Sequence, residues 1–229
     1  MAKKRLVVLS GAGISAESGL GTFRDSGGLW EKYPIEEVAT PEAWQKNPAL
    51  VTEFYNMRRK QAYAAQPNDG HKILAELEND FDVHIITQNI DDLHERAGSS
   101  NVLHLHGEIT KVKSSGPNAE KKYYPQTDWE VKMGDLCPEG YQLRPHVVWF
   151  GEAVPMLDQA AEIVKTAELF LVVGTSLNVY PAAGLVHYAP ETCEKHIIDP
   201  HNVPVSSAFN HILANATEGM PIFKKLITS

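Results

Sequence analysis

The sequence predicts an α/β fold: a doubly wound parallel sheet with an inserted small lobe. Five short apolar runs lack polar alternation, as is typical of strands buried on both faces. These candidate strands are residues 6–9, 83–87, 102–105, 169–173 and 196–198. Candidate helices, with apolar residues three or four apart, are residues 71–77, 157–167 and 220–227. Alternating strands and helices are typical of a doubly wound sheet.

Two stretches interrupt this alternation and predict the small lobe. Within residues 25–68, Thr40 and Asn47 each precede a proline, a pattern that begins a helix, so two helices should start at Pro41 and Pro48. Residues 108–146 are polar and rich in turn signals, which favours a loop or β part. We expect one domain, with a large lobe of about residues 1–24, 69–107 and 147–229 and a small lobe of about residues 25–68 and 108–146.

Composition limits the possible partners. The chain has 229 residues, 43% of them hydrophobic, enough for one core. Its net charge of -8 argues against a nucleic-acid surface, which needs clustered lysine and arginine. Two cysteines form no disulfide framework, and the first apolar run is too short for a signal peptide or membrane span. We therefore expect a cytoplasmic protein with no membrane or nucleic-acid partner. We also expect a monomer, although no sequence pattern determines the oligomeric state.

A glycine-rich turn follows the first candidate strand. Gly11, Gly13 and Ala16 satisfy the small-residue pattern that lets a pyrophosphate approach a helix N-terminus, although a turn without ligand is also compatible with it. No acid-ending strand follows some twenty residues later, as a dehydrogenase would require. Instead comes a glycine-rich loop with Phe23 and Arg24 that could cover a nucleotide. Hydride transfer is therefore less favoured.

Polar side chains end the next two candidate strands. Asn89 and Asp91 follow residues 83–87, and His104 and His106 end or follow residues 102–105. Open α/β sheets bind ligands at the carboxyl ends of their strands, so we expect a nucleotide there with a histidine acting on it. The alternatives are two satisfied core histidines, or an aspartate that caps the next helix. We expect Asp92 to cap and leave Asp91 free.

Five ordered segments, GAGISAESGLGTFR, TQNIDDLHERAG, HLHGE, VVWFGE and GTSLNVYPAAG, resemble the sirtuin family of NAD-dependent protein-lysine deacylases. The resemblance extends from residue 6 to about residue 226, and is to the desuccinylase-type subgroup of bacteria and mitochondria. It implies a Rossmann-like domain with an inserted lobe. The implied reaction converts acyl-lysine and NAD into lysine, nicotinamide and O-acyl-ADP-ribose.

The resemblance assigns site residues. It implies His106 as the base that takes a proton from a ribose hydroxyl, which suits imidazole, with Asn89 and Asp91 beside it; for His104 we favour a structural role. The implied NAD-binding residues are Gly11, Ala12, Gly13, Ser15, Ala16, Thr22, Phe23, Arg24, Trp30, Gln88, Asn89, Ile90, Asp91, Gly174, Thr175, Ser176, Asp199 and Ala216. Asp199 stands where the family usually has asparagine. An acid still accepts hydrogen bonds from ribose hydroxyls but would oppose a 2'-phosphate.

The substrate, an acylated lysine in a protein or peptide, is implied to lie between two extended segments. Their binding residues are Val147, Val148, Trp149, Phe150 and Gly151 in the first, and Val179 and Tyr180 in the second. Ordinary β-structure linking the lobes is the alternative.

Tyr55 and Arg58 lie three residues apart on the helix that starts at Pro48, and so share a face. The family's subgroup that removes succinyl and malonyl groups carries this pair, which binds the distal carboxylate. The alternative is an ion pair within the protein. We expect the neighbouring Asn56, Met57 and Arg59 at the helix surface.

The chain departs from the family at its zinc site. Ser114 and Ser115 stand where the first cysteine pair would begin, and only Cys137 lies near the second. Together with a distant His146, Cys137 does not make a closed tetrahedral site. We therefore predict no metal, and a lobe held by local packing with Tyr123, Tyr124 and Trp129 as candidate core residues.

Two other functions remain open. The first is a protein ADP-ribosyltransferase using the same cofactor, against which Tyr55 and Arg58 argue because they serve an acyl chain. The second is a module that senses NAD without turnover, against which His106, Asn89 and Asp91 argue together.

Overall fold

The computed structural model describes residues 2–22, 32–117 and 122–228. Its large lobe is built on a six-stranded sheet with the order β3-β2-β1-β7-β8-β9. All neighbouring strands are parallel. The strands are β1 (Arg5–Ser10), β2 (Asp82–Thr87), β3 (Val102–His104), β7 (Leu169–Val173), β8 (Glu194–Ile198) and β9 (Phe209–Ile212).

The five predicted strands are confirmed, with ends that differ by a residue or two. The prediction missed β9, whose sequence Phe-Asn-His-Ile has no apolar run because the strand lies at the edge of the sheet. Strand β3 ends at His104, so Leu105 and His106 lie beyond it in a bend.

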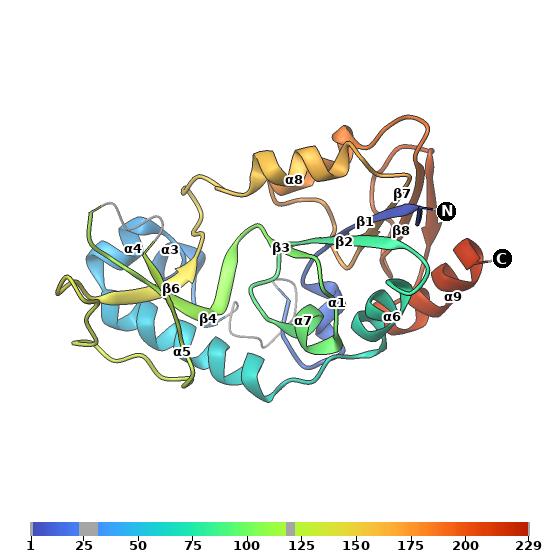
Figure 1. Cartoon of the computed structure of the whole chain (residues 1–229). Helices are drawn as coiled ribbons and strands as arrows, with labels where there is room; N and C mark the ends of the chain where they lie inside the picture. Colours follow the sequence, from blue (N-terminus) through green and yellow to red (C-terminus); the bar gives the residue numbers. More distant parts are fainter. Residues whose placement is uncertain (1, 23–31, 118–121, 229) are drawn as a thin grey trace.

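Helices cover both faces of this sheet (Figure 1). Along β1, Leu6 and Val8 pack in one apolar cluster and Val7 and Leu9 in another, as strict alternation requires. The first cluster includes residues of α1 (Gly13–Ala16), α6 (Asp69–Leu77) and α9 (Ala216–Thr228). The second includes residues of α8 (Leu157–Val164) and of the 3-10 helix η2 (Ala182–Tyr188). Helix α7 (Leu93–Ala97) connects β2 to β3.

The small lobe, at the left in Figure 1, combines helices with an antiparallel sheet. The helices are α3 (Ile35–Val38), α4 (Pro41–Lys46) and α5 (Pro48–Ala64), and the sheet has the order β5-β4-β6, with β4 (Gly107–Ser114), β5 (Tyr123–Pro125) and β6 (Leu143–Val147). The predicted starts of α4 and α5 are confirmed. The Thr40 Oγ1 atom accepts from the Ala43 amide at 3.0 Å, and the Asn47 Oδ1 atom accepts from the Leu50 amide at 3.1 Å.

The expected core of this lobe was wrong. Tyr123 is 47% exposed and Trp129 37% exposed, and Tyr124 is half-buried. The cluster that joins α5 to the sheet contains Phe54 and Ile109.

Two residues expected at the surface of α5 are instead buried: Asn56, and Arg59 with 0% exposure. Arg59 donates to the carbonyl of Ile109 at 2.7 Å and to that of Trp129 at 3.0 Å. Asn56 exchanges two hydrogen bonds with the backbone of Val131, at 2.8 and 3.0 Å. Loop backbone crosses α5 here, and its polar groups need side-chain partners because they are away from water.

Within the described residues, no helix combines the length and apolar character that crossing a bilayer would need.

Candidate active site

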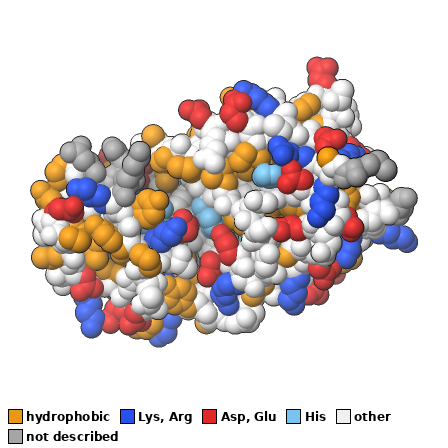
Figure 2. All heavy atoms as spheres, in the orientation of Figure 1, with side chains coloured by type: hydrophobic (Ala, Val, Ile, Leu, Met, Phe, Trp, Pro, Cys, Tyr) orange, Lys and Arg blue, Asp and Glu red, His pale blue; other side chains and the backbone are white. Residues whose placement is uncertain are grey.

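A pocket of about 660 Å³ lies between the two lobes, within the usual range for small-molecule and cofactor sites. In the space-filling view, histidine and acidic side chains gather in the middle of the molecule, between the lobes (Figure 2). The large lobe contributes the ends of β1, β2 and β7, and the small lobe contributes α5 and the segment after β6.

The glycine-rich turn after β1 packs directly against the turn after β7. A Cβ atom on Gly13 would lie 2.7 Å from the Gly174 Cα atom, and one on Gly11 would lie 2.6 Å from the Thr175 Cβ atom. The Gly13 amide donates to the Gly174 carbonyl at 2.8 Å, and Gly174 has a φ of 65°. The glycines are therefore required by contact between two backbones, in addition to any approach of a pyrophosphate. The two turns together form one wall of the pocket.

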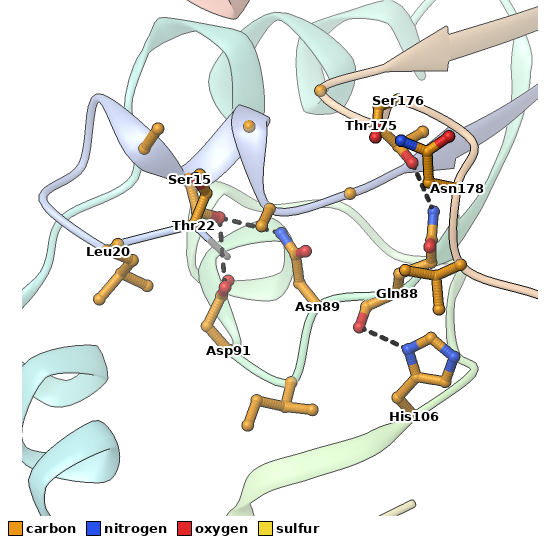
Figure 3. Close-up of a pocket in the computed structure, with 18 of the residues that line it drawn as sticks. Ser15, Leu20, Thr22, Gln88, Asn89, Asp91, His106, Thr175, Ser176 and Asn178 are labelled. Carbon is orange, nitrogen blue, oxygen red and sulfur yellow. Dashed lines mark hydrogen bonds between the residues drawn. The ribbon is translucent and has the colours of Figure 1, made fainter. Parts of the chain in front are cut away.

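Ser15 links the two polar residues that follow β2. Its Oγ atom accepts from Asn89 Nδ2 at 3.1 Å and donates to Asp91 Oδ2 at 3.2 Å, as Figure 3 shows. Burial raises the pKa of Asp91, while hydrogen bonds from the Leu93 amide and the Ser15 hydroxyl oppose that rise. The network holds both side chains at the pocket wall.

The expectation that Asp92 would cap α7 was wrong. Asp91 Oδ1 accepts from the Leu93 amide at 3.2 Å, whereas Asp92 forms no side-chain cap and lies 3.5 Å from Arg96 in an ion pair. Asp91 takes this role because its carboxylate reaches the amide two residues further along. Each of its oxygens keeps further acceptor capacity toward the pocket.

His106 is held by the backbone at the end of β2. Its Nδ1 atom lies 3.0 Å from the Gln88 carbonyl oxygen, which can only accept, so Nδ1 carries the hydrogen and Nε2 keeps a lone pair. Burial lowers the pKa of His106, which favours the neutral ring. A neutral imidazole with a free lone pair at a pocket wall can take a proton.

His104 supports the same segment from outside the pocket. Its Nδ1 atom lies 2.9 Å from the Asn89 carbonyl oxygen, and its Nε2 atom lies 2.8 Å from Glu95 Oε1. Both ring nitrogens are thus engaged within the protein, which agrees with the structural role expected for His104.

The structure brings every described residue of the predicted NAD set to this one pocket. Phe23, Arg24 and Trp30 lie outside the described residues. The residues of the set that line the pocket are Gly11, Ala12, Gly13, Ser15, Ala16, Thr22, Gln88, Asn89, Ile90, Asp91, Gly174, Thr175, Ser176, Asp199 and Ala216.

Sequence reasoning missed His201. Its backbone amide donates to Asp199 Oδ1 at 2.8 Å, and its Nδ1 atom lies 3.3 Å from the same oxygen. The close spacing of a histidine and a strand-ending aspartate was the available signal.

The pocket as a whole joins a strand-end carboxylate, a glycine wall and a neutral imidazole, a set of groups that fits a dinucleotide.

The predicted substrate residues line the same pocket: Tyr55, Arg58, Val147, Val148, Trp149, Phe150, Gly151, Val179 and Tyr180. The two segments are less regular than the extended edges expected, since β6 ends at Val147 and Leu177 has a φ of 56°. The Val148 amide nevertheless donates to the His106 carbonyl at 2.9 Å, which ties the first segment to the loop that carries His106.

Tyr55 and Arg58 form the part of the pocket nearest the small-lobe core. Tyr55 is buried, and the Arg58 guanidinium carbon lies 5.8 Å from its ring centroid. Burial lowers the pKa of Arg58, and Tyr55 and then Asp91 act in the opposite direction. Guanidinium still stays charged at neutral pH because its intrinsic pKa is so high.

Comparisons with known proteins agree with this geometry. A family model described as the Sir2 family matches residues 11–181. The chain belongs to the Sir2 family. An NAD-dependent protein deacylase of Bacteroides thetaiotaomicron is 56% identical over 98% of both chains. The predictions that the chain is a member of this family and an NAD-dependent protein deacylase are confirmed.

Solved Sir2 structures share the fold. A Sir2 homologue in complex with NAD is 39% identical, with a TM-score of 0.88 over 99% of this chain and 90% of that one. A Sir2 variant with deacetylated p53 peptide and 3'-O-acetyl ADP ribose is 30% identical, with a TM-score of 0.81 over 98% of this chain and 94% of that one. The predicted Rossmann-like fold is confirmed.

No group of three or more histidine, cysteine or acidic side chains within the described part of the chain could hold a metal ion. Cys137 instead has its Sγ atom 3.3 Å from the Oγ atom of Ser114. A small lobe without zinc stays a prediction.

Proposed function

We propose that this Sir2 family member removes succinyl and malonyl groups, as well as acetyl groups, from lysine side chains of proteins. The observation that carries the proposal is the shared pocket: Tyr55 and Arg58 line the same cavity as His106, Asn89 and Asp91. A positive guanidinium and a phenol at one end suit a carboxylate. The base at the other side suits chemistry on a ribose.

NAD, when bound, supplies the ADP-ribosyl group that takes over the acyl group as nicotinamide leaves. His106 accepts the proton of a ribose hydroxyl at Nε2, since Nδ1 is fixed on Gln88. Asn89 and Asp91, held by Ser15, position the nicotinamide end of the cofactor. Asp199 and Ala216 would hold its adenosine end, and the amides and hydroxyls of residues 174–176 would hold phosphate or ribose, since all of them line the pocket.

The acylated lysine lies between residues 147–151 and residues 179–180, with its acyl group toward Tyr55 and Arg58. Because an arginine fork and a phenol pair with a carboxylate but not with a methyl group, they contribute to binding succinyl and malonyl more than acetyl. A related Sir2 variant holds a deacetylated peptide, which supports a peptide substrate here. Cys137 and Cys193 are both unpaired, which supports a cytoplasmic location.

The test is to incubate the protein with matched peptides carrying acetyl-, malonyl-, succinyl- or unmodified lysine, with and without NAD, and to follow peptide masses. We expect each acyl mass to be lost only when NAD is present, with release of nicotinamide and O-acyl-ADP-ribose. Loss of acetyl alone would contradict the proposed acyl range, which is the removal of succinyl and malonyl as well as acetyl groups. A mass gain on the peptide would favour an ADP-ribosyltransferase, and NAD binding without turnover would favour a sensor.

A further inference from the structure

Trp149 carries a buried hydrogen-bond donor without a partner. The side chain is 2% exposed, and its Nε1 atom forms no hydrogen bond of ordinary length and angle with the residues that the structure describes. Buried tryptophan N–H groups usually find an acceptor, so this exception needs an explanation. Trp149 lines the pocket together with Tyr55 and Arg58. A missing acceptor at a pocket wall points to a ligand.

The indole ring is held rigidly in place. The guanidinium carbon of Arg144 lies 3.3 Å from the Trp149 ring centroid, and the Trp44 ring centroid lies 5.8 Å away. Arg144 also pairs with both carboxylate oxygens of Glu152, at 3.1 and 3.2 Å. Glu152 in turn accepts from the Trp149 backbone amide at 2.8 Å. The ring therefore cannot rotate toward another acceptor without losing these contacts.

The indole N–H lies beside the proposed acyl-binding pair. Tyr55 and Trp149 belong to one buried cluster and line the pocket together with Arg58, whose guanidinium carbon lies 5.8 Å from the Tyr55 ring centroid. The same three side chains thus place a hydroxyl, a guanidinium and an indole N–H at one end of the cavity.

We propose that the Nε1–H group of Trp149 is a third donor to the distal carboxylate of the acyl group, next to Tyr55 and Arg58. This inference rests on the acyl range proposed above. An ionised carboxylate offers about four lone-pair sites, so it can accept from an arginine fork, a phenol and an indole together. An acetyl group ends in a methyl and leaves the indole N–H unpaired. Such a site discriminates against the smaller acyl group because an unpaired buried donor is costly.

The test compares Trp149→Phe with wild type on matched succinyl- and acetyl-lysine peptides. Phenylalanine keeps an aromatic face for Arg144 but lacks the N–H. We expect the ratio of kcat/KM for succinyl over acetyl to fall about tenfold, the size expected for one charge-assisted hydrogen bond. Trp129→Phe is the matched control, because Trp129 is 37% exposed and does not line the pocket. Its ratio should stay at the wild-type value.

A second variant covers the case in which Trp149→Phe fails to fold, as judged by its thermal transition. β-(3-Benzothienyl)alanine at position 149 keeps the ring shape and replaces only the N–H by sulfur, and it should give the same fall in ratio. If the wild-type enzyme removes succinyl and the position-149 variants keep the wild-type ratio of kcat/KM values, this inference alone is overturned. A wild-type enzyme that removes acetyl but never succinyl overturns the proposed acyl range and this inference with it.

Discussion

The Nδ1 atom of His106 donates to the carbonyl oxygen of Gln88 at 3.0 Å. This contact fixes the ring tautomer and leaves Nε2 as the proton acceptor. Because Gln88 directly follows β2, the end of a buried strand sets the protonation pattern of the proposed base.

Replacing His106 with alanine should slow deacylation by roughly 10²- to 10⁴-fold, the usual contribution of a general base. Because burial lowers the pKa of His106, the neutral ring persists to lower pH than a free histidine would. The acid limb of kcat/KM should therefore lie below about pH 6.5. Nicotinamide release in the presence of acyl-peptide, measured between pH 5 and 8, checks both points. Equally slow release from wild type and variant would favour the NAD sensor.

Arg58→Met tests the acyl range. Loss of the guanidinium should cost roughly 1.5–3 kcal/mol of transition-state stabilisation for a succinyl substrate, and much less for acetyl, because only the carboxylate pairs with it. Values of kcat/KM on matched peptides measure both. Lys60→Met, at an exposed position two residues further along α5, is the control. An equal loss on both substrates would make Arg58 a structural residue.

Sequence patterns could locate the site because its residues follow strands that are recognisable as apolar runs. Asn89 and Asp91 come after β2, and Gly174 comes after β7, both apolar strands, so the topology brings these residues to one edge. The choice between Asp91 and Asp92 as the cap of α7 was not predictable. Both side chains suit a cap, and only the backbone conformation decides which carboxylate reaches the Leu93 amide.

The small lobe was harder to predict, because its stability comes from long-range polar contacts. Arg59 follows a charged neighbour on α5, and helical spacing alone did not place it in the interior. Its partners, the carbonyls of Ile109 and Trp129, lie 50 and 70 residues further along the chain. No local pattern encodes such a contact.

Arg59→Met should lower the free energy of unfolding by about 3 kcal/mol or more, because it leaves buried carbonyls of the small lobe without donors. Urea unfolding followed by circular dichroism measures the change. Glu53→Ala, at an exposed position of the same helix, should shift the free energy by less than about 0.5 kcal/mol. Similar small effects from both variants would contradict the role given to Arg59.

Because we predict no bound metal, treatment with a chelator should leave the stability and activity of the protein unchanged. Ser114 and Cys137 share a contact of 3.3 Å where the resemblance would place zinc ligands. We expect elemental analysis of the purified protein to find less than stoichiometric zinc, and EDTA to alter neither Tm nor deacylation. A chelator-induced fall in Tm, reversed by added zinc, would show that a metal binds.

Acid should destabilise the fold through buried neutral histidines. Burial lowers the pKa of His71 to about 4, whereas an unfolded histidine titrates near 6.5. Between these values the unfolded state binds more protons, so stability is present above about pH 6.5 and is lost as pH falls toward 4. The difference between these two pKa values corresponds to a loss of about 3 kcal/mol of stability once the pH lies below both. Burial also lowers the pKa of His94, whose ring centroid lies 5.0 Å from that of His71, so charging one ring further opposes charging the other.

His71→Gln should therefore show a weaker fall in unfolding free energy than wild type between pH 7 and pH 5, measured by urea titration at each pH. Glutamine cannot take up a proton there, so the linked contribution of this position disappears while that of His94 remains. If the slope of His71→Gln equals that of wild type, then His71 takes up protons equally in the folded and unfolded states, and the interior around Ser15 is more polar than its burial indicates.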